Sequence, residues 1–250
     1  MLKRRPAAFS VGTHPEIECI QKLPMTDKVR ASTIRPAELR HLLRVTAATS
    51  RHPQRDALVL LLGHTCAMRV TEIARVLVSD VLMPSGTRRS EVSLRAAITK
   101  GSTQRCVYMT HALVVDAIEA YVEHRWARGL GTEFDRKRFR GLSPSTPLVL
   151  THKGSGFELQ AKRRTLVGGE RETYWACDSL QAHVTRLYRD AGLQGCSSHS
   201  GRRTFATRLV AQGHAIETVQ RLLGHADIDH TDDYLDVDGR TLAAMFAGAL

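Results

Sequence analysis

The sequence has few aromatic residues, few cysteines and no long apolar segment. Aromatic residues make up 5% of the 250 residues, which argues against a surface that stacks the bases of RNA or single-stranded DNA. The five cysteines are odd in number and form no CxxC pair, so no disulfide framework is indicated and a reducing compartment is expected. The longest apolar run, residues 57–63, is far shorter than the ~20 residues of a membrane helix. Basic residues near the N-terminus precede no apolar segment, so no secretory signal is indicated. We therefore expect a cytoplasmic protein without a membrane partner.

Acidic residues are outnumbered, and they are concentrated at one end of the chain. Lysine and arginine total 36 against 25 aspartates and glutamates, which gives a formal net charge of +11. Residues 1–210 hold 34 basic and 18 acidic residues, whereas residues 211–250 hold 2 and 7. A strongly basic body indicates a polyanionic partner, most simply nucleic acid. The alternative is a charge that serves solubility alone.

The spacing of apolar residues predicts a mainly helical fold with a small antiparallel sheet. Helices are predicted from Pro36, over 53–62, from Arg69 with Leu77 facing inward, over 113–122 with Leu113 on its apolar face, from Asp178 to Gly192, over 200–212, over 215–223, near 234 and from 240. Alternating residues over 91–98, a Gly-Ser turn and a return strand over 105–109 predict a hairpin with Lys100 at its tip. Residues 147–151 are predicted to form one more short strand.

The prolines and basic residues of the first segment predict a separate arm. We expect residues 1–30 to form a flexible basic arm and residues 31–250 to form the main domain. Residues 127–146 are predicted to be loop. The basic stretches 136–140 and 162–164 are candidates for contacts with phosphate groups.

Three separated segments carry the most specific pattern in the chain. Residues 63–73 read GHTCAMRVTEI, residues 198–207 read SHSGRRTFAT, and residues 222–234 read LLGHADIDHTDDY. In this order they resemble the catalytic domain of the tyrosine recombinases, the phage integrase family, over roughly residues 33–240. The pair His199-x-x-Arg202, the Leu-Gly-His that ends at His225, and Tyr234 nine residues later are specific as a set.

The resemblance assigns six catalytic positions, of which Lys100 is placed by its location on the predicted hairpin between the two arginine segments. They are Arg69, Lys100, His199, Arg202, His225 and Tyr234. The fold it implies is the tyrosine-recombinase catalytic domain, of the DNA breaking-rejoining type. Other histidines, among them His41, His64 and His183, are interpreted as ordinary solvated residues, and the other tyrosines as packing residues.

The chemistry of strand cleavage fits these residue types. Breaking a phosphodiester without a metal requires fixed cations that follow charge into the transition state. The forked guanidinium groups of Arg69 and Arg202 match phosphate oxygens and stay charged at every working pH. The nucleophile assigned by the resemblance is Tyr234, whose free pKa near 10 requires a base.

The remaining residues have supporting roles in this interpretation. His199 is the candidate general base, His225 a hydrogen-bond donor to the phosphate, and Lys100 the general acid for the departing 5′ oxygen. Glu72, three residues after Arg69, is expected to orient Arg69 or His199.

The resemblance implies a site-specific DNA recombinase that acts through a 3′-phosphotyrosyl intermediate in integration, excision or inversion, as in mobile genetic elements. It implies double-stranded DNA as partner, a tetramer on DNA in which the C-terminal segment packs into a neighbour, and room for an accessory protein. It implies no cofactor and no metal ion. The alternatives are a type IB topoisomerase-like relaxing enzyme and a non-catalytic DNA-binding regulator on the same fold. A zinc site formed by Cys196 and His199 with the downstream His214, His225 and His230 is a further alternative, although the cysteine pair of structural zinc sites is absent.

Three features depart from the family pattern. Most members carry Thr-Gly-x-Arg where this chain has Cys66-Ala67-Met68-Arg69, a change that costs little if φ at Ala67 is negative. Four aspartates surround Tyr234, and they put regulation in question. Residues 1–30 are too few for the usual N-terminal core-binding domain, so we expect a layout similar to the fimbrial phase-variation invertases.

Overall fold

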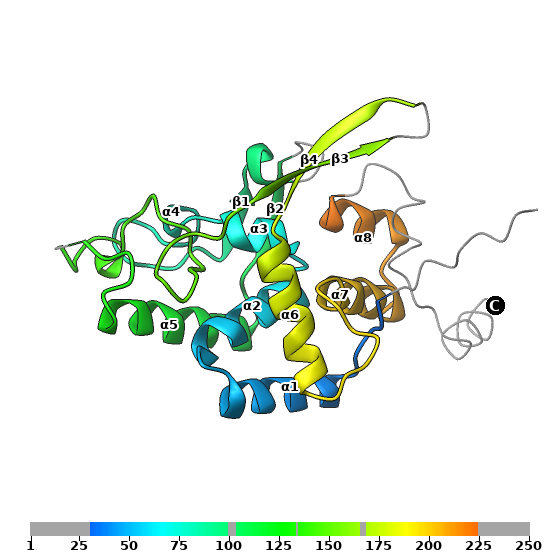
Figure 1. The fold of residues 1–250 in the computed structure, drawn as a ribbon, viewed down its shortest axis with the longest axis horizontal. Coiled ribbons are helices and arrows are strands. Elements are labelled where there is room, and N and C mark those ends of the chain that lie inside the picture. The colour runs from blue at the N-terminus through cyan, green and yellow to red at the C-terminus, as the bar shows by residue number, and fades with distance from the viewer. Residues whose placement is uncertain (1–30, 100–103, 134, 166–168, 225–250) are drawn as a thin grey trace, which may run out of the picture.

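The computed structural model describes residues 31–99, 104–133, 135–165 and 169–224 (Figure 1). Its helices and strands are α1 (Pro36–Thr49), α2 (Pro53–Thr65), α3 (Val70–Arg75), α4 (Val78–Val81), β1 (Glu91–Leu94), β2 (Arg105–Tyr108), α5 (Ala112–Ala127), β3 (Gln160–Thr165), β4 (Arg171–Ala176), α6 (Asp178–Asp190), α7 (Ser200–Ala211) and α8 (Ile216–Leu223). The prediction of a mainly helical fold with a small antiparallel sheet is confirmed. The predicted arm at 1–30 and the helices near 234 and 240 lie outside the described residues.

Helix α2 forms the centre of the fold. It contacts α1, α3, α5, α6 and α7, and the whole apolar run from Leu58 to Leu62 is buried. The sequence pattern predicts that one face of this helix is buried. Its apolar run instead covers all sides, as is typical of a helix that is surrounded by other helices. Pro53 at the first position begins the helix, where its missing N–H costs nothing.

The predicted hairpin is present as β1 and β2, which pair antiparallel with Val92 opposite Val107 and Leu94 opposite Arg105. It is shorter than predicted, because residues 96–98 form a turn of 3-10 helix that buries Ile98. The two alanines before Ile98 have low strand propensity. The prediction that the strand continues over 95–98 is therefore wrong. Lys100 lies outside the described residues.

The predicted strand at 147–151 does not form a ladder. Leu148, Val149 and Leu150 are all buried, but only Pro147 makes an isolated bridge, with Leu77. Buried backbone groups still need partners, and the fully buried Arg125 supplies them by donating to the carbonyls of Pro147 and Leu148 at 2.8 and 3.0 Å. The apolar run over 147–151 therefore marks a buried segment, but the prediction that this segment pairs as a strand is wrong.

Two apolar residues are placed differently from their prediction. Helix α3 ends at Arg75, so Leu77 lies in the connection to α4 and is only half-buried. Leu113 is 42% exposed at the start of α5. Both lie at helix ends, where a period of 3.6 residues no longer determines the direction of a side chain.

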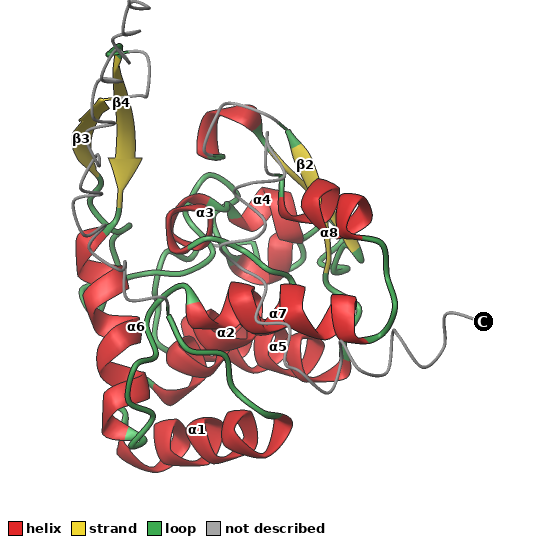
Figure 2. Cartoon of the chain, turned by 90° about the vertical axis from the view of Figure 1, so that its right-hand side faces the viewer, coloured by secondary structure: helices red, strands yellow, loops and turns green. Residues whose placement is uncertain are grey.

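A second antiparallel hairpin, β3–β4, was not predicted. Gln160 pairs with Ala176 at its base and Thr165 with Arg171 toward its tip. It projects from the helical body beside the start of α6, at the end of the molecule opposite α1 (Figures 1 and 2). Its strands carry charged rather than alternating apolar residues, because neither face is packed in the core.

Within the described residues, no helix combines the length and apolar character of a membrane span. 

His64 is buried rather than solvated, contrary to its interpretation from sequence. Its Nε2 lies 2.8 Å from the Tyr188 hydroxyl, which joins α2 to α6. Burial, with a smaller contribution from the positive charge of Arg208, lowers the pKa of His64 to about 3. The imidazole is therefore neutral in the folded protein at any pH near neutrality.

Because the folded pKa of His64 is depressed, the unfolded chain takes up a proton below its ordinary pKa of about 6.5 and the folded chain does not. We expect the free energy of unfolding to fall as pH decreases from about 6.5 towards 3. His64→Gln should reduce this slope by up to about 1.4 kcal/mol per pH unit between pH 6 and pH 5. Urea unfolding at several pH values measures it, and an unchanged slope would contradict the assignment.

Candidate active site

A groove of about 610 Å³ lies between α3, the 96–99 turn, the β3–β4 hairpin and the start of α7. Arg69, His199 and Arg202 all line it, together with Glu72. The structure therefore brings together three of the six residues predicted from sequence, from segments more than 100 positions apart. Lys100, His225 and Tyr234, with the four aspartates around the tyrosine, lie outside the described residues.

Arg69 is fixed by the start of helix α3. It is the N-cap residue, and Glu72 accepts hydrogen bonds from its backbone N–H at 2.7 Å and from its guanidinium Nη1 at 3.0 Å. Both hydrogen bonds run from Arg69 to Glu72, so one carboxylate satisfies the backbone N–H of the N-cap residue and holds its guanidinium. The expectation that Glu72 orients Arg69 is confirmed by this geometry.

Arg202 is positioned by the close approach of α7 to α2. A Cβ built on Gly201 would lie 2.9 Å from the backbone carbon of Gly63, so only glycine allows the two helices this spacing. One turn into α7, Arg202 is almost completely buried. Its guanidinium donates to the carbonyl of Ala67 at 2.6 Å and to the carbonyl of Leu223.

Ala67 has a positive φ of 51°, which contradicts the assumption of a negative φ. This left-handed conformation costs a non-glycine residue roughly 1–2 kcal/mol. The buried methyl group returns about 0.8 kcal/mol, because it packs in a small cluster with Ala206, Val210 and α8. The backbone turn directs the Ala67 carbonyl at the buried guanidinium groups, which is the type of strain found at functional sites.

Arg105 is the residue that sequence reasoning missed. It occupies an inward position of β2 and is 7% exposed. Its Nη2 lies 2.6 Å from Glu72 Oε2 and 3.2 Å from the Ala67 carbonyl, and its Nη1 donates to the Leu222 carbonyl at 2.9 Å. An arginine at an inward strand position, next to the predicted lysine turn, was the only signal in the sequence.

Three arginines converge on the C-terminal end of α8. Arg105 binds the carbonyl of Leu222, Arg202 that of Leu223, and Arg69 that of Gly224 at 3.4 Å. The last carbonyls of a helix lack partners within it and carry partial negative charge. The guanidinium groups donate hydrogen bonds to these carbonyls and bring positive charge to them. They also fix the end of α8, the point from which the chain continues to His225.

Glu72 is the counter-ion of this cluster and is completely buried. Burial alone would raise the pKa of its carboxyl, but Arg105, Arg202 and Arg69 outweigh that effect and hold the pKa below its ordinary value. The carboxylate therefore stays ionised, and it cancels part of the repulsion among the guanidinium groups.

His199 is the N-cap residue of α7 and is exposed at the groove. Its backbone N–H donates to the Ser197 hydroxyl at 3.3 Å, and both His199 and the preceding Ser198 line the groove.

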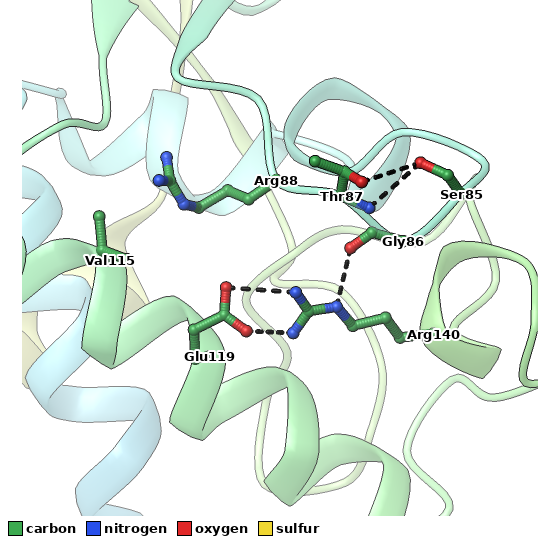
Figure 3. A pocket seen from close by; sticks show the side chains of 7 residues that line it. All are labelled: Ser85, Gly86, Thr87, Arg88, Val115, Glu119 and Arg140. Atoms are coloured by element: carbon green, nitrogen blue, oxygen red, sulfur yellow. Dashed lines mark hydrogen bonds and ion pairs between the residues drawn. The ribbon is translucent and has the colours of Figure 1, made fainter.

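A second cavity, of about 490 Å³, lies between α5 and the α4–β1 connection and does not involve the predicted site (Figure 3). Arg140 spans it, donating to the Gly86 carbonyl at 2.8 Å and pairing with Glu119. Arg136, from the same basic stretch, pairs with Glu123 at 3.1 Å and lies over the Trp126 ring. Two cations of the 136–140 stretch are therefore directed at carboxylates of α5 rather than at a ligand.

Among the described residues, no group of three metal-ligating side chains is close enough to hold a metal ion. Cys196, from the zinc alternative, is buried with its Sγ 3.8 Å from the Ser32 carbonyl, whereas His199 is exposed at the groove. The other histidines of that alternative include two outside the described residues.

Comparison with known proteins agrees with this geometry. The family model described as the phage integrase family matches residues 32–240. The chain belongs to the phage integrase family. The tyrosine recombinase XerD of Pseudomonas putida is 27% identical over 225 residues, and the tyrosine recombinase XerC of Agrobacterium fabrum is 27% identical over 223 residues. These alignments cover 90% and 86% of this chain but only 64% and 58% of the relatives.

Solved recombinases share the fold. The XerA recombinase superposes with a TM-score of 0.59 at 22% identity, covering 87% of this chain and 65% of that chain. The XerH recombinase bound to palindromic difH substrate, a post-cleavage complex, gives 0.60 at 19% identity, covering 88% and 53%. The predicted fold, the tyrosine-recombinase catalytic domain, is confirmed.

Arg105→Met should destabilise the protein strongly, because it removes the 2.6 Å ion pair of the buried Glu72 carboxylate, which keeps only its bonds to Arg69. It also removes the guanidinium that binds the Leu222 carbonyl. We expect a loss of about 3–5 kcal/mol in the free energy of unfolding, measured by urea denaturation. Arg95→Met is the matched control: it breaks the exposed Arg95–Asp80 pair of 3.2 Å and should cost no more than about 1 kcal/mol. Equal losses in the two variants would contradict the role given to Arg105.

Proposed function

We propose that the protein is a site-specific DNA recombinase that cleaves and rejoins DNA through a 3′-phosphotyrosyl intermediate. The observation that carries the proposal is the groove in which Arg69, Arg202 and His199 meet. The relatives named tyrosine recombinases support it, as does the post-cleavage complex of XerH with its difH substrate.

The two arginines are suited to hold one phosphodiester through cleavage. Arg69 is fixed by Glu72, and Arg202 by the carbonyls of Ala67 and Leu223. Guanidinium groups held in place before the reaction stabilise the charge of the pentacoordinate transition state without reorganisation. Removal of either one should raise the barrier by about 3–4 kcal/mol, by analogy with the loss of an oxyanion-hole donor.

The other three catalytic assignments follow from chain continuity and the family pattern. Thr99, which lines the groove, immediately precedes Lys100, the proposed general acid. Gly224, whose carbonyl is bound by Arg69, immediately precedes His225, which would donate to the phosphate. His199 would accept the proton of the nucleophile Tyr234.

Double-stranded DNA is the proposed substrate and partner, and the basic charge of residues 1–210 favours it. We also propose assembly as a tetramer on DNA, with the C-terminal segment packed into a neighbouring copy and residues 1–30 acting as a basic arm. Leu242, Met245, Phe246 and Leu250 are spaced to form one apolar stripe of a helix in that segment. A topoisomerase-like relaxing activity would use the same residues, and a requirement for two DNA sites distinguishes recombination from it.

Tyr234→Phe should abolish covalent attachment to DNA and leave binding nearly unchanged, because only the hydroxyl is lost. The measurement is denaturing gel analysis with nicked duplexes taken from the DNA that flanks the gene. Tyr174→Phe is the control and should retain attachment. An adduct that persists in Tyr234→Phe, or one that maps to another tyrosine, would refute the assignment.

Chelation of divalent metal should not affect cleavage, because the proposed charge stabilisation comes entirely from arginine, lysine and histidine side chains. The rate of adduct formation with and without EDTA measures this. A loss of cleavage in EDTA that Mg²⁺ restores would show that the reaction uses a metal, against this mechanism.

A further inference from the structure

The β3–β4 hairpin presents one face that carries only neutral and positive side chains. Cross-strand partners share a face of an antiparallel pair. The pairs Ala161–Trp175, Arg163–Thr173 and Thr165–Arg171 therefore form one face, which we call the basic face. It holds two arginines and no carboxylate.

The cations of the basic face are available to a ligand. Arg163 and Arg171 are exposed, and neither has an ion-pair partner within the described part of the chain. Lys162, on the opposite face, is bound to Asp178 at 2.7 Å, which ties the base of the hairpin to α6. This differs from the 136–140 stretch, where Arg136 and Arg140 are held by glutamates.

The base of the hairpin forms one wall of the catalytic groove. Thr173 and Trp175 of the basic face line the groove, as do Lys162 and Tyr174 of the opposite face. Trp175 is nevertheless 53% exposed, and tryptophan is enriched at interfaces because its ring is largely apolar and its N–H can donate a hydrogen bond. Arg171 lies four residues beyond Trp175, a distance of about 13 Å along a strand, which matches the axial rise of about four base pairs.

We propose that the basic face of the β3–β4 hairpin binds the phosphate backbone of double-stranded DNA beside the cleavage site, through Arg163 and Arg171. The proposal rests on the proposed recombinase function. In this proposal the hairpin extends the DNA-binding surface beyond the groove. Double-stranded DNA is favoured over a protein partner because the face carries two unpaired positive charges and little apolar area besides Trp175.

The test compares two double variants of the full chain in binding to a fluorescent duplex of arbitrary sequence, about three helical turns long. Arg163→Ala with Arg171→Ala removes two charges from the basic face. Arg40→Ala with Arg44→Ala removes two from exposed positions of α1, at the opposite end of the molecule (Figure 2). Circular dichroism verifies that both variants are folded.

Each phosphate contact contributes about 0.9 to the slope of log K against log salt. The hairpin variant should therefore lower the magnitude of that slope by about 2, whereas the α1 variant leaves it unchanged. Arg163→Lys with Arg171→Lys should restore the slope, because lysine neutralises a phosphate equally well. An unchanged slope in the hairpin alanine variant, or an equal decrease in both alanine variants, would overturn the proposal.

Two further outcomes separate this inference from the proposed function. If the hairpin variant keeps its slope while Tyr234 still forms the adduct, the hairpin inference fails and the recombinase proposal stands. If the intact chain does not bind the duplex at all, both fail. A hairpin variant with unchanged slope but weaker self-association in sedimentation would assign the face to a second copy of the chain, against DNA.

Discussion

The buried ion cluster around Glu72 is the interaction on which the site depends. Arg69 and Arg105 both bind its carboxylate, and Arg105 shares the Ala67 carbonyl with Arg202. Three guanidinium groups this close would repel each other strongly in a low-dielectric interior. The single buried carboxylate and the carbonyls at the end of α8 offset this repulsion, so the guanidinium groups are held together without a bound ligand.

The same cluster connects stability with chemistry. Arg202 and Arg69 face the groove while their other hydrogen bonds hold the end of α8. The segment that continues from α8 carries His225 and Tyr234 in sequence. Any change in this network therefore alters both the arginines proposed to bind phosphate and the point from which the proposed nucleophile segment departs. Arg105 contributes only to the network, since it does not line the groove.

The basic side chains of the surface fall into two groups, those paired with a carboxylate of the protein and those without such a partner among the described residues. Arg136 and Arg140 belong to a conspicuous basic stretch, but they are neutralised by glutamates of α5. Arg163 and Arg171 belong to the basic face of the β3–β4 hairpin, which has no carboxylate. A net charge of +11 therefore indicates the class of partner, and only the structure shows which cations are left to meet it.

The family, the order of the motif residues and most of the helices could be predicted from the sequence, because apolar spacing and helix signals are local. Arg69, His199 and Arg202 were predicted as parts of one site, and they line one groove although they are far apart in the chain. The tertiary structure decided what local patterns do not contain. Where a strand was predicted over 147–151, Arg125 binds the carbonyls of Pro147 and Leu148. The carbonyl of Ala67, whose φ is positive, accepts from two guanidinium groups, and the buried Arg105 is paired with Glu72. Each of these involves a partner many positions away, and a buried polar group is defined by its partner rather than by its own residue type.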